Sequence, residues 1–176
     1  MKTLFALIIL LLFVLNLHSQ IIISDNIHNN TELIDSLVRY CARDLGIDTA
    51  HIEICFNSTD FDKYNNGEYA TVRTTDNKLF VINLQNNLGV QKIKRVIIHE
   101  MFHVYQFVKK ELAIRSYCVY YKGTTYTNDS DYLKREYEIA AFKYTHDFQK
   151  AHKTELNSMI KILKTKKQWK NLQAYW

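Results

Sequence analysis

Two histidines and a glutamate stand within the short run His99-Glu100-Met101-Phe102-His103. Positions i and i+4 of an α-helix lie on the same face, so the imidazoles of His99 and His103 can converge on one metal ion. Glu100 then lies at the edge of that face, where its carboxylate can accept a proton from a metal-bound water without binding the ion. The spacing therefore predicts a metal-binding helix with a general base beside the metal.

The apolar residues around this motif predict one helix over residues 90–108. A stripe at helical spacing faces the expected core and consists of Ile93, Ile97, Met101, Val104 and Val108. Further apolar residues lie on the opposite side, and a helix that is apolar nearly all round is a buried one. Imidazoles and a carboxylate on such a helix need strong partners, because unpaired polar burial is costly. A divalent metal would supply them; the alternative is a buried helix with two incidental histidines.

The H-E-x-x-H spacing is the pattern of zinc metallopeptidases, and catalytic zinc usually has three protein ligands and a water. A third ligand must therefore come from another part of the chain. The metzincin pattern would place Gly and His three and six residues after His103. This chain has Gln106 and Lys109 at those positions, which excludes that branch.

Over residues 99–142 the chain resembles the gluzincin metallopeptidases, in which a Glu on a later helix completes the site and a small residue follows three positions on. Glu138 with Ala141 fits this spacing, whereas Glu136 would place the bulkier Ile139 there. A small residue one turn from the ligand lets two helices approach closely. The resemblance implies that Glu138 joins the two histidines as a Zn²⁺ ligand. Glu136 is the alternative ligand. In a further alternative, both glutamates lie on a solvated helix face and neither binds metal.

The chain departs from the gluzincin pattern at Phe142. Many members of the family have an Asp there, four residues after the ligand Glu, which orients the first histidine. The partner that orients His99 is therefore not identified by the sequence. An aspzincin-like arrangement would use Asp129 or Asp131 as third ligand, although the spacing of that family is not matched.

Residues 1–19 have the features of a secretory signal peptide. Lys2 supplies the positive start, residues 4–15 the apolar core, and residues 17–19 a candidate cleavage site. The apolar core is shorter than the ~20 residues that a helix needs to cross a bilayer, so we expect no membrane anchor. Residues 20–176 then form one domain of a secreted or periplasmic protein.

Composition limits the classes of partner. The formal net charge is +5, and lysines crowd the C-terminal segment, which is typical of a solvated helix face or of contact with an acidic partner. No base-reading module or Gly-rich phosphate loop is present, so we expect no nucleic-acid partner. Peptide or protein substrates and a monomeric state are expected. The three cysteines, Cys41, Cys55 and Cys118, leave open one disulfide and one free thiol.

Periodicity and turn residues predict the elements that position the site. Helices are expected over residues 31–45, 90–108, 133–151 and 155–168, and strands over 51–57, 69–74 and 78–84. Residues 75–77 would close a β-hairpin, and residues 112–131 are expected to be irregular and rich in tyrosine. This order fits an α+β domain, and known minimal zincin-like metallopeptidases are similar, with helices packed on a small, mostly antiparallel sheet.

The expected function is that of an exported zinc-dependent endopeptidase. Zinc held by His99, His103 and Glu138 would lower the pKa of a bound water toward ~7, and Glu100 would accept its proton. Peptides would bind as an added strand along an edge of the sheet, with residues 78–84 as the candidate edge.

Two competing classes and several minor assignments complete the expectations. A non-catalytic binding or inhibitory domain would need a fourth protein ligand, which Cys118, Asp129 or Asp131 could supply. An amidase acting on cell-wall material could use the same site. The second oxyanion donor would be Tyr121 or Tyr126, unless these tyrosines serve packing. His146 and His152 are expected at the surface.

Overall fold

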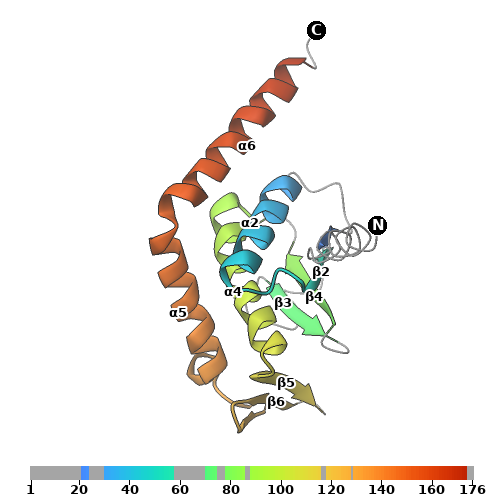
Figure 1. Cartoon of the computed structure of the whole chain (residues 1–176), viewed down its shortest axis with the longest axis vertical. Coiled ribbons are helices and arrows are strands. Elements are labelled where there is room, and N and C mark those ends of the chain that lie inside the picture. The colour runs from blue at the N-terminus through green and yellow to red at the C-terminus, as the bar shows by residue number, and fades with distance from the viewer. Residues whose placement is uncertain are drawn as a thin grey trace, which may run out of the picture.

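Helices and two small sheets alternate along the chain (Figure 1). The computed structural model describes residues 21–23, 30–57, 70–74, 78–85, 88–115, 118–127 and 129–173, so the predicted signal peptide lies outside the described residues. The strands are β1 (Ile21–Ile23), β2 (His51–Asn57), β3 (Ala70–Thr74), β4 (Leu79–Gln85), β5 (Leu112–Arg115), β6 (Cys118–Tyr121) and β7 (Thr124–Tyr126). The helices are α2 (Thr31–Asp44), α4 (Val90–Val108), the 3₁₀ helix η1 (Tyr132–Lys134), α5 (Glu136–Ala151) and α6 (Lys153–Gln173). The predicted α+β class is confirmed.

The first sheet, sheet A, has the strand order β1-β2-β4-β3. β1 pairs with β2 and β2 with β4 in parallel, whereas β3 and β4 are antiparallel, with Thr74 opposite Phe80. The predicted β3–β4 pairing is confirmed, but the prediction of a mostly antiparallel sheet is wrong. Alternating apolar residues specify a strand and not its direction. The chain between β2 and β4 passes through β3, which lets β4 return beside β2 in the same direction.

β4 is an interior strand, because β2 lies on one side of it and β3 on the other. The expectation that residues 78–84 form the exposed edge is therefore wrong. β3, at the end of the strand order, is the edge strand on that side of the sheet. On this side of the sheet the strand that can accept a further partner is therefore β3. The predicted turn at residues 75–77 lies outside the described residues.

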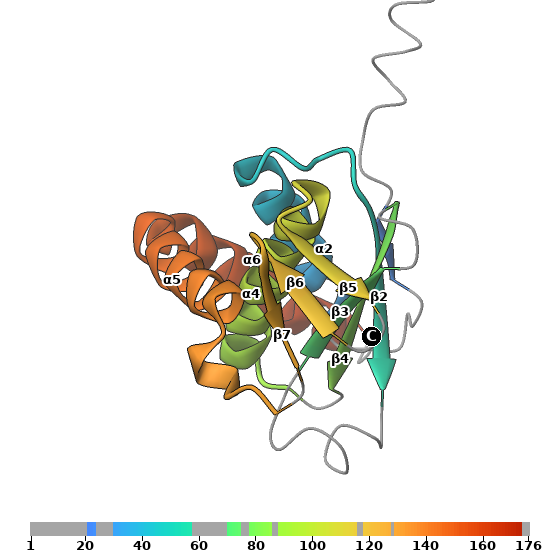
Figure 2. The same cartoon turned by 90° about the horizontal axis from the view of Figure 1, so that it is seen from below.

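α2 and α4 pack on one face of sheet A, and α5 lies against α4 on the side away from the sheet (Figure 2). α4 is therefore central, as its apolar pattern predicted, and it has the predicted bounds of residues 90–108. Ile93, Ile97 and Met101 of α4 are almost fully buried, like Ile54 and Ile82 of the sheet. Packing on both sides fixes the orientation of the site helix.

Residues 112–115, 118–121 and 124–126 form sheet B, which the sequence analysis did not predict. β5, β6 and β7 pair in antiparallel order, so the expectation of an irregular stretch is wrong here. Lys122 and Gly123 both have positive φ, 46° and 89°, which is typical of a tight two-residue hairpin turn. The strands are only three or four residues long, and such short segments show too little alternation to predict a strand.

The last two helices meet at His152, which caps the C-terminal end of α5 with a non-helical φ of −107°. α6 begins at the next residue and projects beyond the rest of the described fold (Figure 1). Within the described ranges, no helix is both long and apolar enough to cross a membrane. The three cysteines are all described, and none of them forms a disulfide.

Candidate metal centre

Three predicted ligands come together between α4 and α5. His99 and His103 stand one turn apart on α4, and Glu138 lies in the first turn of α5. The Nε2 atoms of His99 and His103 lie 3.1 Å and 3.3 Å from Oε2 of Glu138, and 3.2 Å from each other. Each residue is more than nine-tenths buried. The predicted convergence of the two rings and Glu138 is confirmed.

The separations of these atoms fit a tetrahedral metal ion. Ligand atoms bound at ~2.0–2.1 Å in a tetrahedron lie about 3.3 Å from one another, and the three observed separations are 3.1, 3.2 and 3.3 Å. Lone pairs of two imidazoles and a carboxylate oxygen that face one point repel each other unless a cation or protons lie between them. The buried His-His-Glu group could therefore hold a metal ion.

Gln106 fixes the proton of His103 on the far side of the ring. Its side-chain Nε2 donates to the backbone carbonyl of Tyr137 at 3.2 Å, and its Oε1 lies 2.7 Å from Nδ1 of His103. A carbonyl oxygen can only accept, so the amide nitrogen must face Tyr137 and the amide oxygen must face His103. Nδ1 of His103 therefore donates, and in the neutral ring Nε2 is the nitrogen whose lone pair faces His99 and Glu138. Gln106 is fully buried and was not predicted as a site residue.

The electrostatics of the group favour positive charge. Burial lowers the pKa of His103, but hydrogen bonds to Glu138 and Gln106 and the charges of Glu138 and Glu100 raise it, to about 9 overall. Burial raises the pKa of Glu138, but hydrogen bonds and charge interactions with the two histidines lower it, to about 2 overall. The site therefore stabilises a positive charge next to an ionised Glu138, which is the electrostatic condition for binding a cation.

His99 has a different environment from His103. Its Nδ1 is buried and has no hydrogen-bond partner among the described residues. The ring of Phe142 lies against the His99 imidazole with a centroid separation of 4.6 Å. The position where gluzincins often have an orienting Asp is thus used here for ring packing. The first histidine is held by shape and by Glu138 rather than by a second acceptor.

Tyr132 of η1 adds a fourth polar group that the sequence analysis missed. Its hydroxyl donates to Oε2 of Glu138 at 2.8 Å, the same oxygen that faces both histidines. η1 is capped by Asp131, whose carboxylate accepts from the backbone N–H of Leu133. Arg135 lies over the Tyr132 ring at 5.6 Å and donates to the backbone oxygen of Ser130. These contacts hold the Tyr132 hydroxyl beside the ligand atoms.

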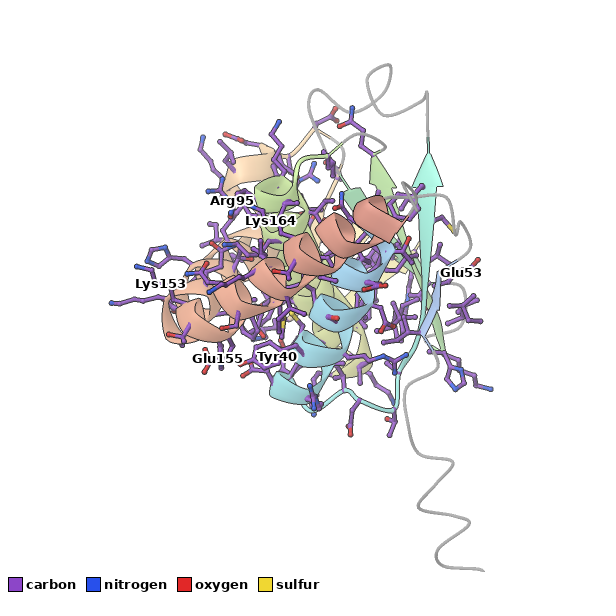
Figure 3. All side chains as sticks on the ribbon, turned by 90° about the horizontal axis from the view of Figure 1, so that it is seen from above. Tyr40, Glu53, Arg95, Lys153, Glu155 and Lys164 are labelled. Carbon is purple, nitrogen blue, oxygen red and sulfur yellow. The ribbon has the colours of Figure 1, made fainter. Side chains whose placement is uncertain are left out.

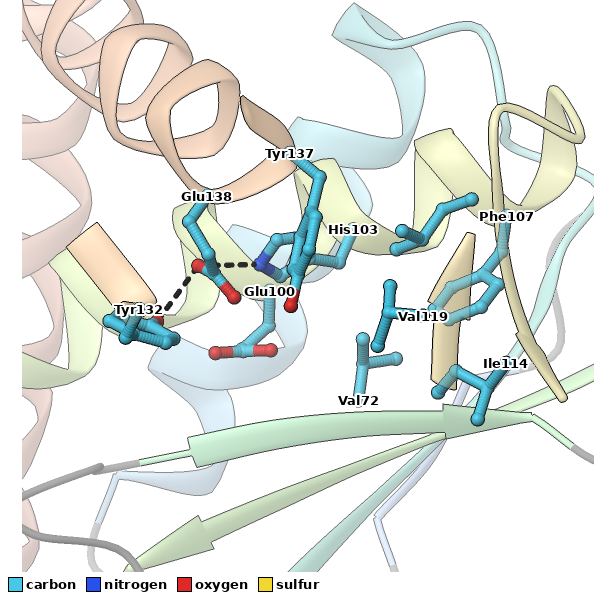
Figure 4. A pocket seen from close by; sticks show the side chains of 10 residues that line it. Val72, Glu100, His103, Phe107, Ile114, Val119, Tyr132, Tyr137 and Glu138 are labelled. Atoms are coloured by element: carbon cyan, nitrogen blue, oxygen red, sulfur yellow. Dashed lines mark hydrogen bonds and ion pairs between the residues drawn. The ribbon is translucent and has the colours of Figure 1, made fainter. Parts of the chain in front are cut away.

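Glu100 faces a pocket that opens beside the ligands (Figure 4). The pocket is also lined by His103, Tyr132 and Glu138, and Glu100 is 6% exposed. The predicted general base and two of the predicted ligands thus line one cavity. An arrangement of this kind can bind a small group or a peptide segment next to a metal ion.

The alternative ligands of the sequence analysis lie outside the metal-binding group. Glu136, Asp129 and Asp131 are exposed, and Asp131 pairs with Lys134 at 3.2 Å. Cys118 is half-buried on β6. Ala141, three residues after Glu138, is fully buried in the α4–α5 region, as its spacing predicted. Of the candidates weighed, Glu138 is the one that reaches the histidines.

The candidate oxyanion donors serve packing instead. Tyr121 and Tyr126 contact the Tyr137 ring, with centroid separations of 6.1 Å and 5.4 Å, and neither is among the residues that line the pocket. His146 is exposed as expected. His152 is half-buried and hydrogen-bonded, so the expectation of a surface residue is only partly met.

The fold and site define an α+β protein with a buried two-histidine, one-glutamate group that could hold a metal ion. Comparisons with protein-family models, with curated proteins and with solved structures found no match. The functional argument therefore rests on the residues and their geometry.

Proposed function

We propose that this chain is an exported, zinc-dependent peptidase of the zincin-like class, related in its site to the gluzincins. The observation that supports it best is the tetrahedral spacing of His99, His103 and Glu138 beside a pocket that also contains Glu100. Two imidazoles and one carboxylate are a common ligand set of catalytic zinc. The features of residues 1–19 support export.

The roles of the side chains follow from their positions. Bound zinc would supply a water of lowered pKa and would polarise the scissile carbonyl. Glu100 accepts the proton of the attacking water and passes it to the leaving amine. The Tyr132 hydroxyl donates to Glu138 in this structure, and it would turn this one proton from Glu138 to the carbonyl oxygen as that oxygen gains negative charge. Gln106 keeps the His103 lone pair directed at the metal position.

The substrate would lie along β3. This strand is an edge of sheet A, and its residue Val72 lines the same pocket as Glu100. A peptide that pairs with the backbone of an edge strand is held extended, and its scissile bond can then be presented to the metal site. The edge strand expected from the sequence, β4, could not do this because both its sides are paired.

The competing non-catalytic class would require a closed metal site. Structural zinc generally has four protein ligands. Among the described residues, the metal-binding group contains three, and a pocket opens beside it. This open arrangement favours catalysis. An amidase acting on cell-wall material would use the same groups, but it would not cleave the peptide library of the test described next.

The test combines metal analysis with cleavage of a mixed peptide library by wild type and by Glu100→Gln. We expect bound zinc in both proteins and a loss of about 10²–10⁴-fold in cleavage for Glu100→Gln, the usual contribution of a general base. Glu111→Gln is the matched control, since Glu111 follows α4 and pairs with Lys122 rather than with the site. Equal cleavage by wild type and Glu100→Gln would remove Glu100 from the mechanism. Zinc-loaded wild type that cleaves no peptide would contradict the peptidase proposal.

A further inference from the structure

The net positive charge of this chain belongs to its last segment. Residues 156–176 contain no Asp or Glu and five of the 23 Lys and Arg: Lys161, Lys164, Lys166, Lys167 and Lys170. The 18 Asp and Glu all precede this segment, where they balance the other 18 Lys and Arg. The formal charge of +5 therefore resides in α6 and the residues that follow it. A segment charged in this way is attracted to anionic surfaces.

The same segment contains both tryptophans of the chain, Trp169 and Trp176. Tryptophan has a large apolar ring with one N–H group, and it is enriched where a bilayer meets water. Lysines alone would be typical of a solvated helix face, but tryptophans among them are not expected on such a face. The combination of lysine with tryptophan is typical of a helix that lies on a membrane surface.

α6 is attached to the fold through the apolar residues of its first turns. Leu156 and Ile160 are buried and belong to the hydrophobic core, and α6 contacts α2 and α5. Ile162, by contrast, is 57% exposed. Beyond these turns the helix projects from the rest of the described fold as far as Gln173 (Figure 1). The basic part of α6 is thus presented away from the metal-binding group and the sheets.

Helical spacing continues the line of the exposed isoleucine along α6. Trp169 follows Ile162 by seven residues, close to two helical turns, so the two positions lie on one line along the helix. The position of Lys161 lies on one side of this line, and the positions of Lys166 and Lys170 lie on the other. Apolar positions flanked by lysines on both sides fit the boundary between anionic headgroups and acyl chains.

We propose that α6 is an arm that binds the surface of a membrane containing anionic lipids. Its lysines attract the headgroups, and the line from Ile162 to Trp169 enters the interface between headgroups and acyl chains. An acidic protein would need the lysines alone, so the apolar line favours a lipid surface as the partner. The inference is independent of the peptidase proposal and goes beyond it, because it concerns the surface on which the protein is held.

The test titrates the chain without its predicted signal peptide with vesicles of equimolar phosphatidylglycerol and phosphatidylcholine, and with vesicles of phosphatidylcholine alone. Tryptophan fluorescence reports on the proposed arm, because both tryptophans lie in it. We expect a blue shift of the emission with the anionic vesicles, binding more than about tenfold weaker to phosphatidylcholine, and weaker binding as salt is added. The absence of binding to the anionic vesicles, or equal binding to both kinds, would overturn the proposal.

A double variant tests whether the lysines of α6 hold the vesicles. Each lysine near an anionic membrane contributes about fivefold to affinity, so Lys161→Gln combined with Lys166→Gln should weaken binding about 25-fold. Lys109→Gln combined with Lys110→Gln is the matched control. It removes the same charge at two exposed positions between α4 and β5, away from the projecting part of α6 (Figure 1). Equal losses in the two double variants would overturn the assignment to α6.

A third variant separates a lipid surface from an acidic protein. Ile162→Ser should weaken binding to the anionic vesicles about tenfold, because an apolar side chain no longer enters the interface, and should leave binding to soluble poly-L-glutamate unchanged. Ile139→Ser, at a 50% exposed position of α5, is the matched control and should bind the vesicles within about twofold of wild type. Vesicle binding that Ile162→Ser leaves unchanged, with poly-L-glutamate bound as tightly as the vesicles, would overturn the lipid surface in favour of an acidic protein.

Discussion

Two clusters in this protein combine histidine with a carboxylate, and they differ in how their polar atoms are satisfied. The second cluster lies where α2, α5 and α6 meet, and there His152 pairs with Asp44 at 3.2 Å through Nε2 and with the Tyr40 hydroxyl at 2.7 Å through Nδ1. Tyr144 donates to the other oxygen of Asp44 at 2.9 Å. Figure 3 labels Tyr40 on α2 and Glu155 on α6, whose charge acts on the Tyr40 hydroxyl.

In this second cluster each polar atom points at a different partner. Burial, together with the charges of Glu155 and Asp44, raises the pKa of Tyr40, so its hydroxyl keeps the proton that it can donate to His152. The side chains of His152 and Asp44 are 28% and 33% exposed, so water can also reach them. A closed set of donors and acceptors of this kind joins helices and leaves no site for an ion.

At the metal-binding group, by contrast, three ligand atoms point at one place. The side chains of His99, His103 and Glu138 are only 9%, 6% and 8% exposed, so they are far less hydrated than His152 and Asp44. Residue types alone therefore do not distinguish a site from a structural cluster. A metal site differs from a structural cluster in that its ligand atoms converge on one buried point.

The largest effect should follow removal of a converging ligand. Glu138→Ala should lower zinc affinity by more than about a hundredfold, the upper value for residues that only orient a ligand. Zinc affinity is measured by competition with a chromophoric chelator. Glu136→Ala is the matched control, since Glu136 is exposed on the same turn of α5. Loss of zinc from Glu136→Ala and not from Glu138→Ala would move the third ligand and remove the distinction between the clusters.

A smaller loss is expected when the residue that orients a ligand is changed. Gln106→Leu keeps the volume but leaves Nδ1 of His103 and the carbonyl of Tyr137 without their partner, so zinc affinity should fall about 10- to 100-fold. Gln149→Leu is the control, because the buried amide nitrogen of Gln149 has no hydrogen-bond partner in the described part of the chain. Equal zinc affinities for the two variants would show that Gln106 does not direct His103.

Tyr132→Phe should separate metal binding from catalysis. The variant removes one hydrogen bond to Glu138 and the proposed donor to the carbonyl oxygen, but it keeps the ring beneath Arg135. We expect zinc affinity to change by less than about tenfold, while kcat falls about 10²-fold, as when an oxyanion donor is lost. A fall in zinc affinity that accounts for the whole loss of activity would make Tyr132 a ligand-positioning residue alone.

The sequence predicted the parts of the site that depend on helical spacing. The spacing of four residues on a buried helix predicted that His99 and His103 lie side by side. The small residue Ala141 favoured Glu138 over Glu136 as the third ligand. Gln106 could also have been found, because a polar residue at position i+3 from His103 on an apolar helix must find a partner. Phe142 contradicted the gluzincin pattern, and the structure explains it as a packing partner of His99.

The parts that could not be predicted depend on pairing between distant segments. The alternation in β2 and β4 is the same for parallel and antiparallel neighbours, so strand direction was not determined by it. The strands of sheet B are too short to show a period. The sequence therefore did not predict that Leu112, Ile114 and Val119 line the pocket. Tyr132 reaches Glu138 because a 3₁₀ turn precedes α5, where a continuous helix had been expected.

The smallest effect, and the sharpest test of the comparison, should come from the second cluster. His152→Ala removes the hydrogen bond with Tyr40, the ion pair with Asp44 and the ring packing on Phe148. The free energy of unfolding should therefore fall by about 1–3 kcal/mol. Zinc affinity and peptide cleavage should stay within about twofold of wild type, because no ligand atom points to His152. His146→Ala, at an exposed position of α5, should change the free energy of unfolding by less than about 0.5 kcal/mol. The free energy of unfolding is measured by urea unfolding of the zinc-free proteins. A tenfold or larger loss of zinc affinity in His152→Ala would contradict the separation of the two clusters, because it would mean that the second cluster supports the metal site through α5.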